Sequence, residues 1–105
     1  MRVVLSERVE AELEHHFAYG VEKFGRLVAE RTFSRVRRFL LYSLAAFPHI
    51  GVYRSARDVF EVVIPRTPFI AFYRIDASAD VLTVLAFFHY AQDRESEWKG
   101  NKGRA

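Results

Sequence analysis

Apolar residues in the first half of the chain recur at intervals of three and four positions. Between Glu7 and Gly25 the periodic residues are Val9, Leu13, Phe17, Val21 and Phe24. Between Gly25 and Pro48 they are Leu27, Phe33, Val36, Leu40, Leu44 and Phe47. This spacing places apolar side chains on one stripe of a helix, facing a core. Because Gly25 permits a tight reversal and Pro48 cannot continue a helix, we predict two helices joined as an αα-hairpin.

Short apolar runs on either side of this hairpin predict β-strands. The first run covers residues 2–5 and ends at Ser6, a favoured residue at the start of a helix. Four later runs cover residues 51–54, 59–64, 69–75 and 81–89. The links between them are short and rich in turn-forming residues, which favours antiparallel pairing. The predicted fold is α+β: an N-terminal strand, an αα-hairpin and a four-stranded, mostly antiparallel sheet.

The composition limits the classes of protein that this chain can represent. Half of its 105 residues are hydrophobic, which suffices for one core but not for two. Cysteine is absent, which excludes a disulfide framework and thiolate metal sites. No apolar run is long enough to cross a membrane, and the glutamates near the start differ from a secretory signal. We expect a soluble, cytoplasmic domain with no metal, no cofactor and no membrane partner.

The predicted second helix is more basic than the chain as a whole. The formal net charge of the chain is +3, whereas this helix sets a single acid, Glu30, against a row of arginines. The row consists of Arg26, Arg31, Arg35, Arg37 and Arg38. Such a row suits nucleic acid or an acidic protein surface, and a merely solvated helix face is the alternative.

Five local patterns also follow one another along the chain in a fixed order. They are Phe24-Gly25 followed by Ala29 and Phe33; Leu44 to Gly51, a Leu-x-x-x-Pro-x-x-Gly pattern; Arg57-Asp58-Val59; Phe72-Tyr73-Arg74-Ile75-Asp76; and His89 followed by Asp93. Together with the predicted element order, this set resembles the RelE/ParE toxin superfamily over nearly the whole chain. The resemblance implies the toxin of a bacterial type II toxin–antitoxin system, which causes growth arrest. It also implies a cognate antitoxin of the ribbon-helix-helix type, which neutralises the toxin in a hetero-oligomer.

The resemblance departs from the superfamily where the ribonuclease branch needs basic groups. Gln92 occupies the arginine position of the terminal His-x-x-Arg-Asp motif, and residues 69–72 are apolar where RelE-like toxins usually carry an arginine. The resemblance therefore favours the ParE-like branch, whose members bind DNA gyrase and cleave no nucleic acid. The alternatives are a RelE-like, ribosome-dependent messenger-RNA endoribonuclease and a degenerate, non-toxic homologue that only binds antitoxin.

Candidate site residues follow from these alternatives. An endoribonuclease would draw on His89, Tyr90, Arg57 and Arg74 for acid–base and phosphate contacts. For antitoxin binding the candidates are Phe17, Phe24, Phe33 and Phe39. For target binding they are Arg54, Arg57, Arg74, Trp98 and Lys99. The toxin domain is expected to span residues 1–92, with residues 93–105 as a charged, flexible tail.

Two neighbouring histidines on the predicted first helix are a further possible site. His15 and His16 are consecutive, and consecutive helical residues point about 100° apart. They are therefore not arranged as a paired metal site. We expect both side chains to be exposed to solvent.

Overall fold

The computed structural model describes residues 1–92. Its elements are β1 (Arg2–Leu5), α1 (Glu7–Phe24), α2 (Arg26–Arg38), the π-helical turn η1 (Phe39–Ser43), α3 (Leu44–Ala46), β2 (Val52–Arg54), β3 (Val59–Val63), β4 (Phe69–Asp76) and β5 (Val81–His89). The predicted α+β fold is confirmed. The second helix differs from the prediction in one respect, because a wider π-helical turn interrupts it before α3.

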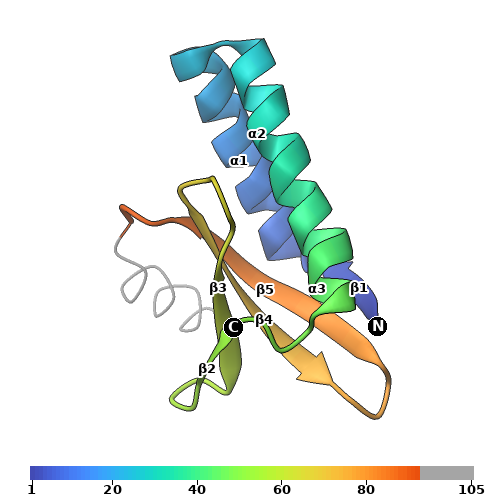
Figure 1. The fold of residues 1–105 in the computed structure, drawn as a ribbon. Coiled ribbons are helices and arrows are strands. Elements are labelled where there is room, and N and C mark those ends of the chain that lie inside the picture. Colours follow the sequence, from blue (N-terminus) through green and yellow to red (C-terminus); the bar gives the residue numbers. More distant parts are fainter. Residues whose placement is uncertain (93–105) are drawn as a thin grey trace.

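The strands form one five-stranded sheet in the order β1-β5-β4-β3-β2. β1 pairs in parallel with β5, and the three other pairs are antiparallel. The α1–α2 hairpin crosses one face of this sheet (Figure 1). The parallel pair follows from the order of elements, since the hairpin carries the chain from β1 across the sheet before the meander of the later strands begins.

The hairpin begins and reverses at the residues that the sequence indicates. The hydroxyl of Ser6 accepts a hydrogen bond from the N–H of Val9 at 3.2 Å, which caps the first turn of α1. Gly25 joins the helices with φ at +89°, a conformation that residues with a Cβ rarely adopt. The link between α1 and α2 is therefore this single residue.

A bulge in β5 keeps the core continuous under the hairpin. The register of β4 and β5 shifts at mid-strand and leaves Leu85 without a partner. Side chains alternate between the two faces of a strand, and the extra residue shifts this alternation by one position. Val84 before the bulge and Phe87 after it therefore both belong to the hydrophobic core. A carboxylate oxygen of Glu12 in α1 accepts a hydrogen bond from the N–H of Phe87 at 2.8 Å, which ties the hairpin to the strand just beyond the bulge.

The hairpin extends beyond the sheet, so part of the predicted core stripe is exposed. The far ends of α1 and α2 project past the strands (Figure 1). Phe24 and Leu27, at the turn of the hairpin, are 63% and 61% exposed. At the opposite end, Phe47 follows α3 outside the helical conformation and is 65% exposed. The prediction that these stripe residues face a core was wrong. Helical periodicity identifies a face, but it does not say how far the opposing sheet reaches.

Candidate functional site

A groove of about 730 Å³ lies where the hairpin overhangs the sheet. Its walls come from α1 and α2, and its floor from the start of β4 and the end of β5. The residues that matter below are His16, Tyr19, Phe24, Val28, Phe69 and His89. We call this surface the hairpin groove. It exists because the projecting half of the hairpin has no strand beneath it.

The hairpin groove is lined by aromatic rings where α1 meets the sheet. The ring of His16 lies edge-on to Phe69 and Phe87, with centroids 5.4 Å and 5.8 Å apart, and His89 lies edge-on to Phe69 at 5.5 Å. Burial lowers the pKa of His16, and the neighbouring His15 and His89 lower it further, against an opposing hydrogen bond with Gln92. Near neutral pH the imidazole of His16 is therefore uncharged, which suits an apolar occupant.

The expectation of two exposed histidines was wrong for one of them. His15 is exposed, but His16 is half-buried. The sequence carries the signal, because His16 stands three positions after Leu13 and seven after Val9, on the buried stripe of α1. The groove histidine could have been found by extending that stripe to polar residues.

The rim of the hairpin groove exposes large apolar side chains. Tyr19, Phe24 and Val28 are 57%, 63% and 48% exposed. Several large apolar residues gathered at one exposed edge are typical of a surface that another chain covers. The rim therefore has the composition of a protein-binding site.

A smaller groove of about 360 Å³ runs between α1 and α2. Its apolar lining includes Phe17 and Phe33, whose ring centroids are 5.7 Å apart. Of the predicted antitoxin residues, Phe17 thus lines this groove, Phe24 lines the hairpin groove, and Phe33 lines both. Phe39 packs half-buried against the core.

At the other end of the sheet, Tyr73 fastens the loop that follows α3. Its hydroxyl donates a hydrogen bond to the carbonyl oxygen of Pro48 at 2.8 Å and accepts one from the N–H of Gly51 at 3.0 Å. Burial raises the pKa of Tyr73, so the hydroxyl remains a donor. A Cβ on Gly51 would lie 2.9 Å from the carbonyl oxygen of Glu61 and from the hydroxyl of Tyr73. Two of the sequence patterns therefore meet in one structural contact.

Arg74 fastens the β2–β3 turn in the same region. Its guanidinium donates to the carbonyl oxygens of Arg57 and Asp58, both at 3.0 Å. Asp58 adopts φ of +55° and accepts a 2.6 Å hydrogen bond from the hydroxyl of Tyr53. Arg54 forms an ion pair with Glu61 at 2.9 Å. We call residues 48–58, Tyr73 and Arg74 the sheet corner. It contains Arg54, Arg57 and Arg74, the target-binding candidates that lie within the described residues.

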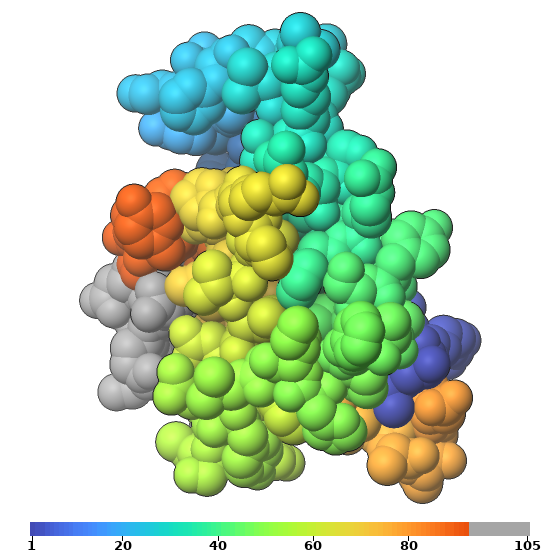
Figure 2. Space-filling model, viewed as in Figure 1, coloured from blue at the N-terminus to red at the C-terminus, as the bar shows by residue number. Residues whose placement is uncertain are grey.

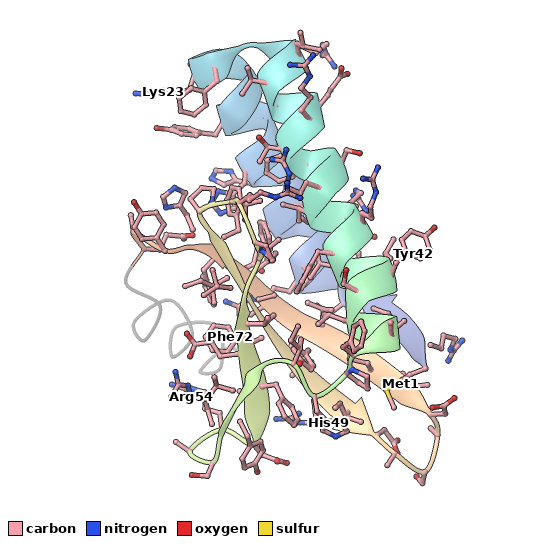
Figure 3. All side chains as sticks on the ribbon, viewed as in Figure 1. Met1, Lys23, Tyr42, His49, Arg54 and Phe72 are labelled. Carbon is pink, nitrogen blue, oxygen red and sulfur yellow. The ribbon has the colours of Figure 1, made fainter. Side chains whose placement is uncertain are left out.

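The four residues considered for catalysis do not come together. His89 pairs with the first residue of β4, whereas Arg74 lies five positions further along, about 17 Å at the rise of a strand. Tyr90 stacks on His89, and Arg57 lies beside Arg74. The set therefore divides into two pairs at opposite ends of the sheet. Figure 3 shows Arg54 at the sheet corner and Lys23 near the turn of the hairpin, at opposite ends of the molecule.

Trp98, Lys99 and the proposed tail of residues 93–105 lie outside the described residues, so what was expected of them stays a prediction. Among residues 1–92, no three His, Cys, Asp or Glu side chains are placed to hold a metal ion. None of the helices in this range is long and apolar enough to cross a membrane.

Comparison with known proteins agrees with the fold. Residues 3–94 match the family model for the ParE toxin of the type II toxin–antitoxin system parDE. A chain in a solved structure of the chromosomal ParDE toxin–antitoxin system from P. aeruginosa is 16% identical and has a TM-score of 0.68. The similarity covers 85% of this chain and 95% of that one. No curated protein sequence matches at a significant level.

Proposed function

The chain belongs to the ParE toxin family of type II toxin–antitoxin systems, and we propose that it acts by binding DNA gyrase rather than by cleaving RNA. The observation that carries this proposal is the division of the candidate catalytic residues. His89 and Tyr90 lie at one end of the sheet and Arg57 and Arg74 at the other. General acid–base catalysis requires its groups within hydrogen-bonding reach of one reacting site. Binding of gyrase would place the protein in the cytoplasm and lead to growth arrest.

A cognate antitoxin of the ribbon-helix-helix type is the proposed neutralising partner. Its toxin-binding segment would cover the exposed rim of the hairpin groove, contacting Phe24, and continue toward Phe17 and Phe33 between the helices. The apolar rim and the aromatic lining support an amphipathic segment as occupant. Phe39 would contribute only through its exposed part. The resulting particle is a toxin–antitoxin hetero-oligomer.

The sheet corner is the proposed gyrase-binding surface. Arg54 and Arg57 lie together there, on a turn that Arg74 holds in place. We propose that Trp98 and Lys99, from a C-terminal segment of residues 93–105 that follows a toxin domain of residues 1–92, extend this surface. Arginine and tryptophan are enriched among residues that dominate binding energies. The target and antitoxin surfaces would then be separate.

Induced expression in a bacterial host tests the proposal. Gyrase supercoiling and cleavage are assayed beside primer-extension mapping of messenger RNA. We expect inhibited gyrase and intact transcripts. Transcripts cut at codon-defined positions, with normal gyrase, would contradict the proposal and establish a ribonuclease. Normal growth together with antitoxin binding would identify a degenerate homologue.

Two paired variants separate the alternatives at the level of residues. Arg54→Ala combined with Arg57→Ala should weaken gyrase inhibition by about tenfold, since one decade corresponds to roughly 1.4 kcal/mol. His89→Ala combined with Tyr90→Phe should leave gyrase inhibition unchanged. If the His89 and Tyr90 variant lost more gyrase inhibition than the arginine variant, the gyrase-binding site would lie at the end of β5 instead. Antitoxin binding by the arginine variant serves as the control for folding.

A further inference from the structure

Three arginines form a straight stripe along the outer side of α2. Arg31, Arg35 and Arg38 follow one another at intervals of four and three positions, which places them within about 60° around the helix axis. The buried residues of α2 point to the opposite side; they are Ala29, Phe33 and Val36. Arg31 and Arg38 are exposed and Arg35 is half-exposed. The surface of α2 is open along this side of the molecule (Figure 2).

The stripe differs from the other arginines of the same helix in its pairing. Arg26 forms an ion pair with Glu30 at 3.5 Å, and Arg37 forms one with Glu10 of α1 at 3.2 Å. Within the described residues, the ion pairs found involve none of the three stripe arginines. Their positive charge is therefore not compensated locally.

The spacing of the stripe fits a regular polyanion. Arg31 and Arg38 are seven residues apart, which corresponds to about 10 Å along a helix. One strand of duplex DNA carries a phosphate about every 3.4 Å of axis, so this length faces roughly three phosphates. Arginine also binds phosphate oxygens with two N–H groups at once.

The residue types favour a duplex over other anionic partners. No aromatic side chain lies between the three arginines on this face, whereas single-strand binding relies on aromatic residues that stack on bases. Apolar residues are also absent from the centre of the stripe, whereas protein interfaces have an apolar core. We propose that Arg31, Arg35 and Arg38 bind the sugar–phosphate backbone of double-stranded DNA without reading its sequence. This inference goes beyond gyrase binding and does not depend on it.

Fluorescence anisotropy with a labelled 20-base-pair duplex of mixed sequence tests the proposal. The full chain is titrated between 50 and 200 mM NaCl. Two double variants with the same change in charge are compared: Arg31→Gln with Arg38→Gln, from the stripe, and Arg26→Gln with Arg37→Gln, from the ion pairs. Each lost phosphate contact reduces the magnitude of the slope of log K against log [NaCl] by about 0.9. The stripe variant loses two contacts, so the magnitude of its slope should be smaller by about 1.8. The loss of affinity relative to the unmodified chain should therefore be about tenfold larger at 50 mM than at 200 mM NaCl. The ion-pair variant should keep a slope close to that of the unmodified chain.

Three outcomes would overturn the proposal. Equal losses in the two double variants would show that only overall charge matters. Tighter binding to a single-stranded 20-mer than to the duplex would exclude the duplex as the ligand. Absence of duplex binding at 50 mM, with stripe-dependent binding of poly-glutamate, would replace DNA by an acidic protein surface. Circular dichroism of both variants shows whether they remain folded.

Discussion

The sheet corner and the hairpin groove use their polar and aromatic residues in opposite ways. At the sheet corner, Tyr73 and Arg74 reach across the fold to backbone groups of the loop and the turn that they hold. At the hairpin groove, Tyr19 and Phe24 extend from α1 with more than half of each side chain exposed. The polar side chains of the sheet corner are hydrogen-bonded within the chain, whereas the hairpin groove leaves apolar surface exposed for a partner to cover.

This difference separates residues that hold the loops of the fold from residues that offer an open apolar surface. The patterns around Gly51, Arg57 and Tyr73 occur where the loops of the fold are fastened. The exposed rim at Phe24 carries no such bonds. The patterns at the sheet corner therefore reflect the construction of the fold, and antitoxin binding is best sought where the fold leaves apolar surface open. The predictions below test each side of this contrast.

The same glycine-to-alanine substitution should have opposite effects in the two regions. In Gly51→Ala the new Cβ would meet a backbone oxygen of Glu61 at 2.9 Å, and we expect a loss of about 3 kcal/mol in the free energy of unfolding. In Gly20→Ala, beside the hairpin groove, the Cβ would meet Ala29 at 3.6 Å, an ordinary contact, and helix propensity should add up to about 1 kcal/mol. Urea unfolding measures both, and equal effects would contradict the contrast.

Removing one hydroxyl should loosen the sheet corner. Tyr73→Phe leaves the carbonyl of Pro48 and the N–H of Gly51 without this partner, and we expect a loss of about 2 kcal/mol in the free energy of unfolding. Tyr42→Phe is the matched control, since Tyr42 is 70% exposed, and should change stability by less than about 0.5 kcal/mol. If Tyr73→Phe left the free energy of unfolding unchanged, the hydroxyl would not be what fastens the loop.

Polar substitutions at the hairpin groove should affect binding but not folding. Phe24→Ser and Tyr19→Ser remove exposed apolar surface from the groove rim, so each should change the free energy of unfolding by less than about 0.5 kcal/mol. Antitoxin affinity, measured by calorimetry, should fall about tenfold for each, or roughly 1.4 kcal/mol. Full affinity in both variants would place the antitoxin elsewhere.

The smallest expected effect is the dependence of stability on pH at the groove floor. Burial first, and then His15 and His89, lower the pKa of His16 in the folded chain from 6.5, while the unfolded chain keeps the ordinary value. As the pH falls below 6.5 the unfolded chain binds the additional proton, so stability decreases until the folded-state pKa is passed. Thermal unfolding between pH 7 and pH 5 should therefore change less in His16→Gln than in the unmodified chain. An equal change in both would show that His16 does not contribute.

The elements of the fold could be predicted because their signals are local. The stripes of α1 and α2, the reversal at Gly25 and the stop at Pro48 depend on residues a few positions apart. The contacts of the sheet corner could not be predicted in this way. Gly51 and Tyr73 are separated by 22 positions and meet only through the pairing of β3 and β4. Both residues belonged to recognised patterns, but a pattern does not say which of its members touch.

The candidate site could be predicted only in part, because some of its features depend on local patterns and others on contacts between distant residues. Phe17, Phe24 and Phe33 were selected from the helical stripes and do line grooves. The exposure of Leu27 and the burial of His16 depend on where the sheet ends under the hairpin, which no helical period encodes. The division of His89 from Arg74 depends on the β4–β5 register, including its bulge at Leu85.

Hydrogen–deuterium exchange of the full chain, with and without its cognate antitoxin, tests the central claim most directly. The claim is that the hairpin groove, and not the sheet corner, is the surface left open for that partner. We predict slower exchange on binding in residues 15–33 and 87–92, with residues 48–61 unchanged. Protection confined to residues 48–61, with the hairpin unchanged, would contradict the account.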